Sequence, residues 1–185
     1  MLSWLGRRLR GKRSEATSRD QAAALVRAGL EQQQAERHDE AERYFYRALA
    51  LEPGSAEIQL HLGNLFRVLG RHEAALHCCR EAIRLAPDFA QAHNNLGNAH
   101  LDQGHLGDAI AEYRRAIALD AGLPEAHFNL AGALIQSGDL GDAADGYREA
   151  ARLKPDFATA HLNLSFLLEE RGDAQGAIAA YRAAI

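Results

Sequence analysis

Residues 87–97 read Pro-Asp-Phe-Ala-Gln-Ala-His-Asn-Asn-Leu-Gly, and related versions of this stretch return later in the chain. They read Leu-Pro-Glu-Ala-His-Phe-Asn-Leu-Ala at residues 123–131 and Pro-Asp-Phe-Ala-Thr-Ala-His-Leu-Asn-Leu-Ser at residues 155–165. Asn95, Asn129 and Asn163 are therefore 34 residues apart. A fixed period of this length is typical of a repeat architecture in which each unit is one supersecondary element. The sequence thus predicts an array of similar units.

Each unit is predicted to contain two helices joined by a tight turn. Glycine recurs where the first helix must end in a left-handed residue, at Gly70, Gly104, Gly138 and Gly172. Proline cannot continue a helix and should end the second one, at Pro53, Pro87 and Pro155. Asp88 and Asp156 are expected to cap the helices that follow them. The predicted units are 22–55, 56–89, 90–123, 124–157 and an incomplete 158–185.

Small and large side chains also recur in step with the period. Gly97 and Ala109 should let two antiparallel helices approach closely, while Tyr113 fills the space beside them. The position of Tyr113 is occupied in the successive units by Phe45, Cys79, Tyr113, Tyr147 and Tyr181. We therefore expect Tyr113 to be buried.

This pattern of period, small residues, aromatic residue and proline resembles the tetratricopeptide repeat family over residues 22–185. The resemblance implies an all-α, right-handed superhelical solenoid of helix-turn-helix repeats. It also implies that one side of the first helices lines a concave groove, the usual ligand surface of the family. The predicted peptide-binding residues of this groove are Asn64, Gln91, Asn94, Asn95, Asn98, Phe128, Asn129, Leu162, Asn163 and Phe166.

The three asparagines in register, Asn95, Asn129 and Asn163, are called the asparagine ladder here. Packed helices lie about 8–10 Å apart, and an extended peptide advances about 3.3 Å per residue. Successive ladder amides would therefore meet an extended ligand at about every third residue. Because an amide both donates and accepts hydrogen bonds, the ladder would recognise peptide backbone. The alternative is that the ladder is an ordinary solvated helix face.

The phrase Ala-His-x-Asn-Leu and residues 109–117 are similar to the repeats of O-linked N-acetylglucosamine transferases and related bacterial proteins. In that group an asparagine ladder holds acceptor polypeptides. The primary prediction is a scaffold that binds an extended polypeptide. The alternative is the N-terminal recruiting arm of a larger transferase whose catalytic domain is not in this chain.

Charge is unevenly distributed along the chain. Residues 1–13 carry five basic side chains and no acidic one, so the remaining residues carry −4 − 5 = −9. An acidic body argues against nucleic acid as a partner. Residues 1–20 are predicted to form a basic tail and linker, which either is solvated or lies on an anionic membrane surface.

No catalytic motif is present, so no enzyme activity and no cofactor are predicted for these residues. His93, His127 and His161 occupy equivalent positions about 10 Å apart, too far to share a metal ion. We expect them to pack between helices with a ring nitrogen hydrogen bonded. Cys78 and Cys79 are expected to be unpaired, semi-buried side chains, which fits a reducing compartment, the cytoplasm.

The second helix of the last unit is incomplete at the end of the sequence. Ala177, Ile178, Tyr181 and Ile185 would leave an apolar stripe on it uncovered. From this we expect either a longer parent protein or self-association through that end.

Overall fold

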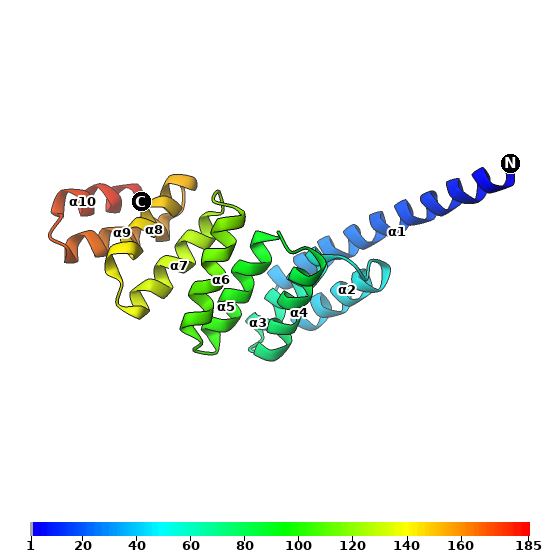
Figure 1. Cartoon of the computed structure of the whole chain (residues 1–185), viewed down its shortest axis with the longest axis horizontal. Coiled ribbons are helices and arrows are strands. Elements are labelled where there is room, and N and C mark those ends of the chain that lie inside the picture. Colours follow the sequence, from blue (N-terminus) through cyan, green and yellow to red (C-terminus); the bar gives the residue numbers. More distant parts are fainter. Residues whose placement is uncertain (1) are drawn as a thin grey trace. The chain divides into compact units, whose positions relative to one another are not determined.

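The computed structural model describes the backbone of residues 2–185 and the side chains of residues 17–185 (Figure 1). All regular secondary structure in this part is helical. The chain divides into an N-terminal unit, Met1–Ala86, and a C-terminal unit, Pro87–Ile185, and each is described by itself. The helices are α1 (Leu2–Gln34), α2 (His38–Leu51), α3 (Ala56–Val68), α4 (His72–Leu85), α5 (Ala90–Asp102), α6 (Leu106–Leu119), α7 (Pro124–Ser137), α8 (Leu140–Leu153), α9 (Ala158–Glu170) and α10 (Ala174–Ala183).

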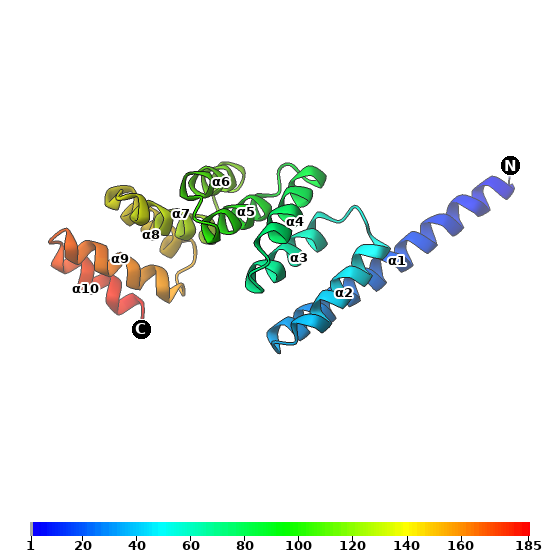
Figure 2. The same cartoon turned by 90° about the horizontal axis from the view of Figure 1, so that it is seen from below.

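Consecutive helices form hairpins. The N-terminal unit contains the hairpins α1–α2 and α3–α4, with α2 packed against α3. The C-terminal unit contains α5–α6, α7–α8 and α9–α10, and each hairpin packs against the next (Figure 2). The predicted all-α repeat fold is therefore confirmed.

The helix ends follow the predicted turn chemistry except at two caps. Gly70, Gly104, Gly138 and Gly172 all have positive φ, from 68° to 88°. The predicted caps Asp88 and Asp156 are wrong, because the N-cap positions are Phe89 and Phe157, which make no side-chain cap hydrogen bond. Each aspartate lies one residue too early to reach the free N–H groups of the first turn. Side chains do cap other helices, from Ser55, Asp139 and Asp173.

The first helix extends further toward the N-terminus than the repeat pattern does. Thr17–Asp20, within the predicted linker, are helical. The side chains of the basic segment 1–13 lie outside the described residues, as does their predicted contact with solvent or membrane. Within the described part of the chain, no helix has the length and apolar character needed to cross a bilayer.

The close approach of the two helices in a hairpin depends on missing side chains. A Cβ atom at Gly97 would lie 2.6 Å from the ring of Tyr113, which is fully buried. Gly29 meets Phe45 in the same way, also at 2.6 Å. At Gly63 the partner is the smaller Cys79, whose Sγ would be 3.1 Å away. The predicted burial of Tyr113 is confirmed, and glycine leaves room for the ring.

Hairpin α7–α8 places its glycine on the opposite helix. Ala131 stands where the earlier hairpins have Gly29, Gly63 and Gly97. Gly146 on α8 faces it, and a Cβ there would lie 3.0 Å from the Cβ of Ala131. The Cβ atom that Ala131 adds to α7 is thus matched by the absence of a Cβ atom at Gly146 on α8.

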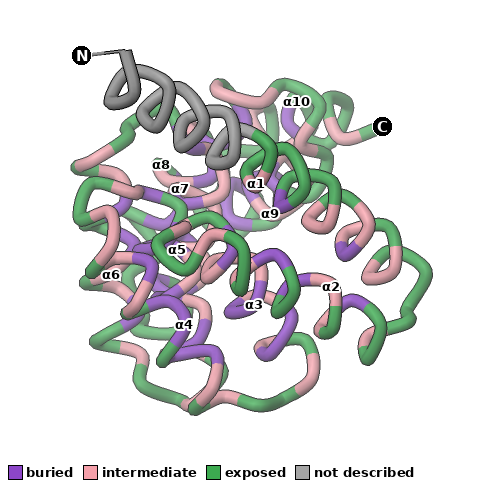
Figure 3. Tube along the Cα trace, turned by 90° about the vertical axis from the view of Figure 1, so that its right-hand side faces the viewer, coloured by how far each residue is buried: buried purple, intermediate pink, exposed green. Residues whose placement is uncertain are grey.

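Apolar side chains are buried between hairpins as well as within them. Tyr113 and Ala109 of α6 form a core cluster with Ala133 of α7. Tyr147 of α8 packs in a cluster with Leu164 of α9. Figure 3 shows buried positions recurring along α3 to α9, interleaved with exposed ones. Neighbouring hairpins in a unit therefore cover each other's apolar faces.

Cys78 and Cys79 are buried and unpaired, as predicted. Burial raises the pKa of Cys78 to about 11 and that of Cys79 to about 12. Both thiols are therefore protonated at neutral pH and behave as small apolar groups.

We expect Gly97→Ala to lower the free energy of unfolding by about 1–3 kcal/mol, because the added methyl group overpacks the buried ring of Tyr113. Gly63→Ala is the matched control, since Cys79 leaves more room and alanine favours helix by about 0.5–1 kcal/mol. Urea denaturation of both variants measures the difference. Equal effects would contradict the close-packing account.

We expect iodoacetamide at pH 8 to react more slowly with the folded protein than with the protein in urea. The expected factor is about 100-fold for Cys78, whose pKa rises from 9.0 to about 11, and about 1,000-fold for Cys79, whose pKa rises from 9.0 to about 12, because the thiolate fraction falls in proportion. The raised pKa of Cys78 also makes the stability of the protein depend on pH. The contribution of this buried thiol to the free energy of unfolding is fully present below pH 9.0, the ordinary pKa of cysteine, and is lost as the pH rises through about 11. Equal alkylation rates in the two states would contradict the burial.

Candidate functional site

The asparagine ladder lies entirely in the C-terminal unit, with one amide on the first helix of each hairpin. Asn95 is on α5, Asn129 on α7 and Asn163 on α9, and all three are half-buried. The equivalent positions in the N-terminal unit are Arg27 on α1 and His61 on α3, and the His61 ring stacks on Phe45 with ring centroids 5.6 Å apart. The amide pattern is therefore specific to the C-terminal unit.

A buried asparagine connects two of the ladder amides. Asn94 is only 6% exposed, and its Oδ1 accepts a hydrogen bond of 2.9 Å from Nδ2 of Asn129. Its own Nδ2 donates to Oδ1 of Asn95 at 3.4 Å. Asn94 thus links α5 to α7 and orients the Asn129 amide, whose oxygen and second N–H stay available.

Buried tyrosines contact other amides of this face. The hydroxyl of Tyr113 donates to Oδ1 of Asn98 at 2.8 Å. Tyr147 has Gly132 at the position equivalent to Asn98, and its hydroxyl instead pairs with Asn163 of the next hairpin. Burial raises the pKa of Tyr147, and the hydrogen bond with Asn163 partly offsets that rise. These contacts hold Asn98 and Asn163 against the hairpin core.

The other predicted groove residues differ in their surroundings. Gln91 is exposed, and Leu162 is half-buried. Phe128 is half-buried between Phe157 and Tyr147, with ring centroids 4.8 Å and 5.3 Å away. Phe128 is therefore largely occupied by packing. Asn64 is half-buried on α3, in the N-terminal unit.

An apolar hollow lies between α9 and α10, and Phe166, three residues after the ladder residue Asn163, lines it. Phe166 on α9 is 55% exposed and lines an open concavity of about 650 Å³ with residues of α10. Ile178 and Tyr181 are each 53% exposed there, and Ile185 is 92% exposed. The C-terminal unit thus presents amides and an apolar surface on neighbouring helices.

Each of the repeated histidines has a hydrogen-bonded ring nitrogen, as predicted, and the partners of His127 and His161 lie in the loops between hairpins. Nε2 of His127 lies 3.0 Å from the carbonyl oxygen of Ala121. Nε2 of His161 lies 3.0 Å from that of Pro155. A carbonyl oxygen can only accept, so Nε2 is the donor in both cases. Nδ1 of His93 contacts Glu112 at 2.7 Å. Nε2 of His93 lies 3.4 Å from the carbonyl oxygen of Pro87, so each of the three rings contacts the chain that enters its first helix.

Comparison with known families identifies the repeat. Profiles described as "Tetratricopeptide repeat" match residues 22–55, 94–156 and 128–185, and one described as "TPR repeat" matches residues 63–104. The chain belongs to the tetratricopeptide repeat family. No curated protein sequence matches it.

Solved structures share the fold at low sequence identity. PilF of Pseudomonas aeruginosa superposes with a TM-score of 0.81 at 21% identity, over 91% of this chain and 76% of that one. TTC0263 of Thermus thermophilus gives 0.76 at 21% identity, over 88% and 89%. YrrB, described as a TPR protein with an unusual peptide-binding site, gives 0.60 at 19% identity, over 87% and 83%. These similarities show a common tetratricopeptide fold.

The supporting role of Asn94 is not part of the sequence prediction, which places this residue in the ligand surface. A signal for it is present, because the equivalent positions hold the apolar residues Leu60, Phe128 and Leu162. A position that is apolar in the other repeats is a packing position. An asparagine there needs a partner inside the protein.

We expect Asn94→Leu to leave the free energy of unfolding unchanged or to raise it by about 1 kcal/mol. The lost hydrogen bonds contribute about 0.5–1.5 kcal/mol each, and a buried leucine side chain contributes about 1.5–3 kcal/mol. Leu60 and Leu162 show that the repeat accommodates leucine at this position. Urea denaturation tests this, and a loss of more than about 1 kcal/mol would mean that Asn94 is kept for stability.

Proposed function

We propose that this protein is a protein-interaction scaffold that binds an extended polypeptide along the asparagine ladder of its C-terminal unit. The observation that carries the proposal is the placement of one amide on each of α5, α7 and α9, at a 34-residue period. Amides at the spacing of packed helices match the backbone of an extended chain at about every third residue.

The orientation of the amides supports a binding role. Asn129 is held by Asn94, and Asn163 is held by Tyr147. Each of these bonds uses only part of the hydrogen-bonding capacity of the ladder amide, so groups remain for a ligand. An amide that is already fixed loses little conformational entropy on binding, which favours affinity.

The charges nearby favour a neutral or basic ligand segment. Asp102 and Glu170 are exposed on the ladder helices α5 and α9. Glu125 on α7 pairs with Lys154 at 3.7 Å. A strongly acidic segment would be repelled by the exposed carboxylates of Asp102 and Glu170, whereas Phe166 offers an apolar contact to a side chain of the ligand.

The test uses a linear peptide selected on the full chain from a random 12-residue phage-displayed library. Replacing Asn95, Asn129 and Asn163 together by alanine should weaken binding of that peptide by roughly 1.5–4 kcal/mol, the net contribution of about three hydrogen bonds. Fluorescence anisotropy measures the affinity. Urea denaturation checks that the variant remains folded.

A matched control has the same spacing on the second helices. Arg80, Arg114 and Arg148 are exposed, lie 34 residues apart, and do not line the hollow beside Phe166. Their replacement by alanine should leave the affinity for the peptide within about twofold, the expectation for exposed residues outside the site. The ladder proposal fails if the asparagine variant binds as well as the arginine variant, or if no peptide is selected.

A further inference from the structure

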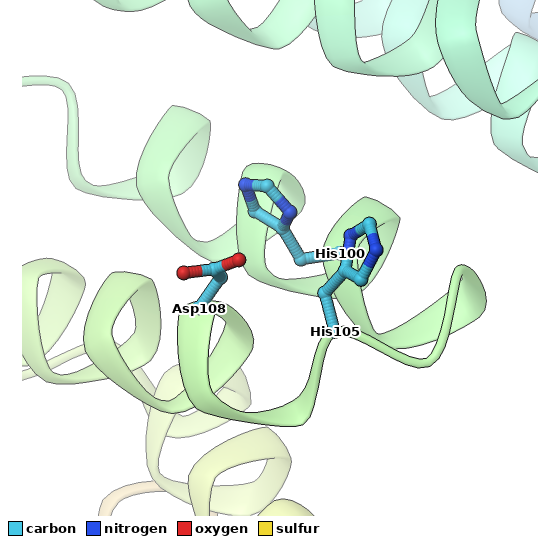
Figure 4. A group of neighbouring side chains, drawn as sticks. All are labelled: His100, His105 and Asp108. Atoms are coloured by element: carbon cyan, nitrogen blue, oxygen red, sulfur yellow. The ribbon is translucent and has the colours of Figure 1, made fainter.

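A group of metal-ligating side chains lies at the turn between α5 and α6, apart from the asparagine ladder. His100 is in the last turn of α5, His105 is the N-cap residue of α6, and Asp108 is in the first turn of α6. One ligand atom from each of the three lies within 4.8 Å of the other two. Figure 4 shows the two rings and the carboxylate converging over the turn.

The backbone of this turn holds the three residues in a fixed relation. The N–H of His105 donates to the carbonyl of His100 at 2.9 Å, and the N–H of Gly104 donates to Leu101 at 2.9 Å. Gly104 takes the left-handed conformation that this hydrogen-bond pattern requires, with φ of 79°. The side chains are therefore carried by a rigid helix end and a rigid helix start, as a binding site needs.

The sequence of this hairpin departs from the repeat at the centre of the group. In three of the other four hairpins the position equivalent to His100 holds a buried apolar residue, Phe66, Leu134 or Leu168, and in the first hairpin it holds Gln32. His100 instead places a ring nitrogen, Nδ1, in a buried position, where no described residue offers it a hydrogen bond. Buried polar atoms are normally paired. The Nδ1 atoms of His38 and His72 also have no partner among the described residues, but only His100 lies beside two further possible ligands there.

We propose that His100, His105 and Asp108 bind a divalent transition-metal ion, with Zn²⁺ as the best match. Two imidazoles and one carboxylate are a donor set that suits Zn²⁺, and three protein ligands leave a coordination position open. Tetrahedral Zn²⁺ needs its ligand atoms roughly 3.3 Å apart. The present 4.8 Å can shorten by side-chain rotation, since His105 and Asp108 are exposed. The ion would join α5 to α6 across the turn, and its open position would face solvent at the exposed end of the hairpin.

The experiment uses the full chain without an affinity tag, after treatment with a chelator. Isothermal titration with Zn²⁺ should give one site per chain, and Co²⁺ should give the visible d–d absorption of a low-symmetry site. His105→Ala and Asp108→Asn change exposed side chains and should each weaken Zn²⁺ binding by at least about tenfold. His100→Leu, which restores the residue of two other repeats, should abolish it.

His72→Leu is the matched control. His72 also has a buried Nδ1 without a partner, but it belongs to no group of three possible ligands among the described residues. Its replacement should leave Zn²⁺ affinity unchanged. As an independent readout, Zn²⁺ should raise the melting temperature of the original protein and of His72→Leu, but not that of His105→Ala.

Two results would overturn the proposal. One is that no Zn²⁺ or Co²⁺ binding is detected at metal concentrations up to about 100 μM. A structural metal site binds its ion far more tightly than that. The other is binding that His105→Ala and Asp108→Asn leave intact, which would place the ion elsewhere on the protein.

Discussion

The structure depends on the close approach of the two helices in each hairpin, which in α1–α2 and α5–α6 comes from a glycine on one helix facing an aromatic ring on the other. In hairpin α5–α6 the ring of Tyr113 lies 2.6 Å from the point where a Cβ atom of Gly97 would be. This contact brings the two helices together, and the same ring then packs on Ala133 of the next hairpin. One side chain thus closes a repeat and joins it to its neighbour, so burial within a hairpin and packing between hairpins are coupled.

The same rings also set the polar surface. Tyr113 and Tyr147 are buried, and each needs a hydrogen-bond partner for its hydroxyl. They find it in the amides of Asn98 and Asn163. The hydrophobic core and the proposed peptide-binding amides are therefore not independent layers, because the hydroxyl at the edge of the core orients the amide at the surface.

The period of the sequence was enough to predict the helices, the left-handed glycines and the burial of Tyr113, because each follows from local chemistry repeated in register. The environment of Asn94 was not predicted, since its partner Asn129 lies on another hairpin and depends on how hairpins stack. Asp88 and Asp156 were predicted as caps, but each lies one residue before the actual N-cap. The residue at which the helix starts decides this, and the repeat pattern does not fix it. The group around His100 spans a turn, so helical spacing gives no sign of it.

The exchange of a methyl group between Ala131 and Gly146 has a consequence for how such arrays diversify. In hairpin α7–α8 the Cβ present on one helix is compensated by its absence on the other. A recombination event that joined α7 to α6 would bring together Ala131 and Glu112, two residues that both carry Cβ atoms at the point of contact. Hairpin α9–α10 carries side chains at both equivalent positions, Ser165 and Ala180, so the match between Ala131 and Gly146 is a property of hairpin α7–α8, whose two helices should be exchanged only together.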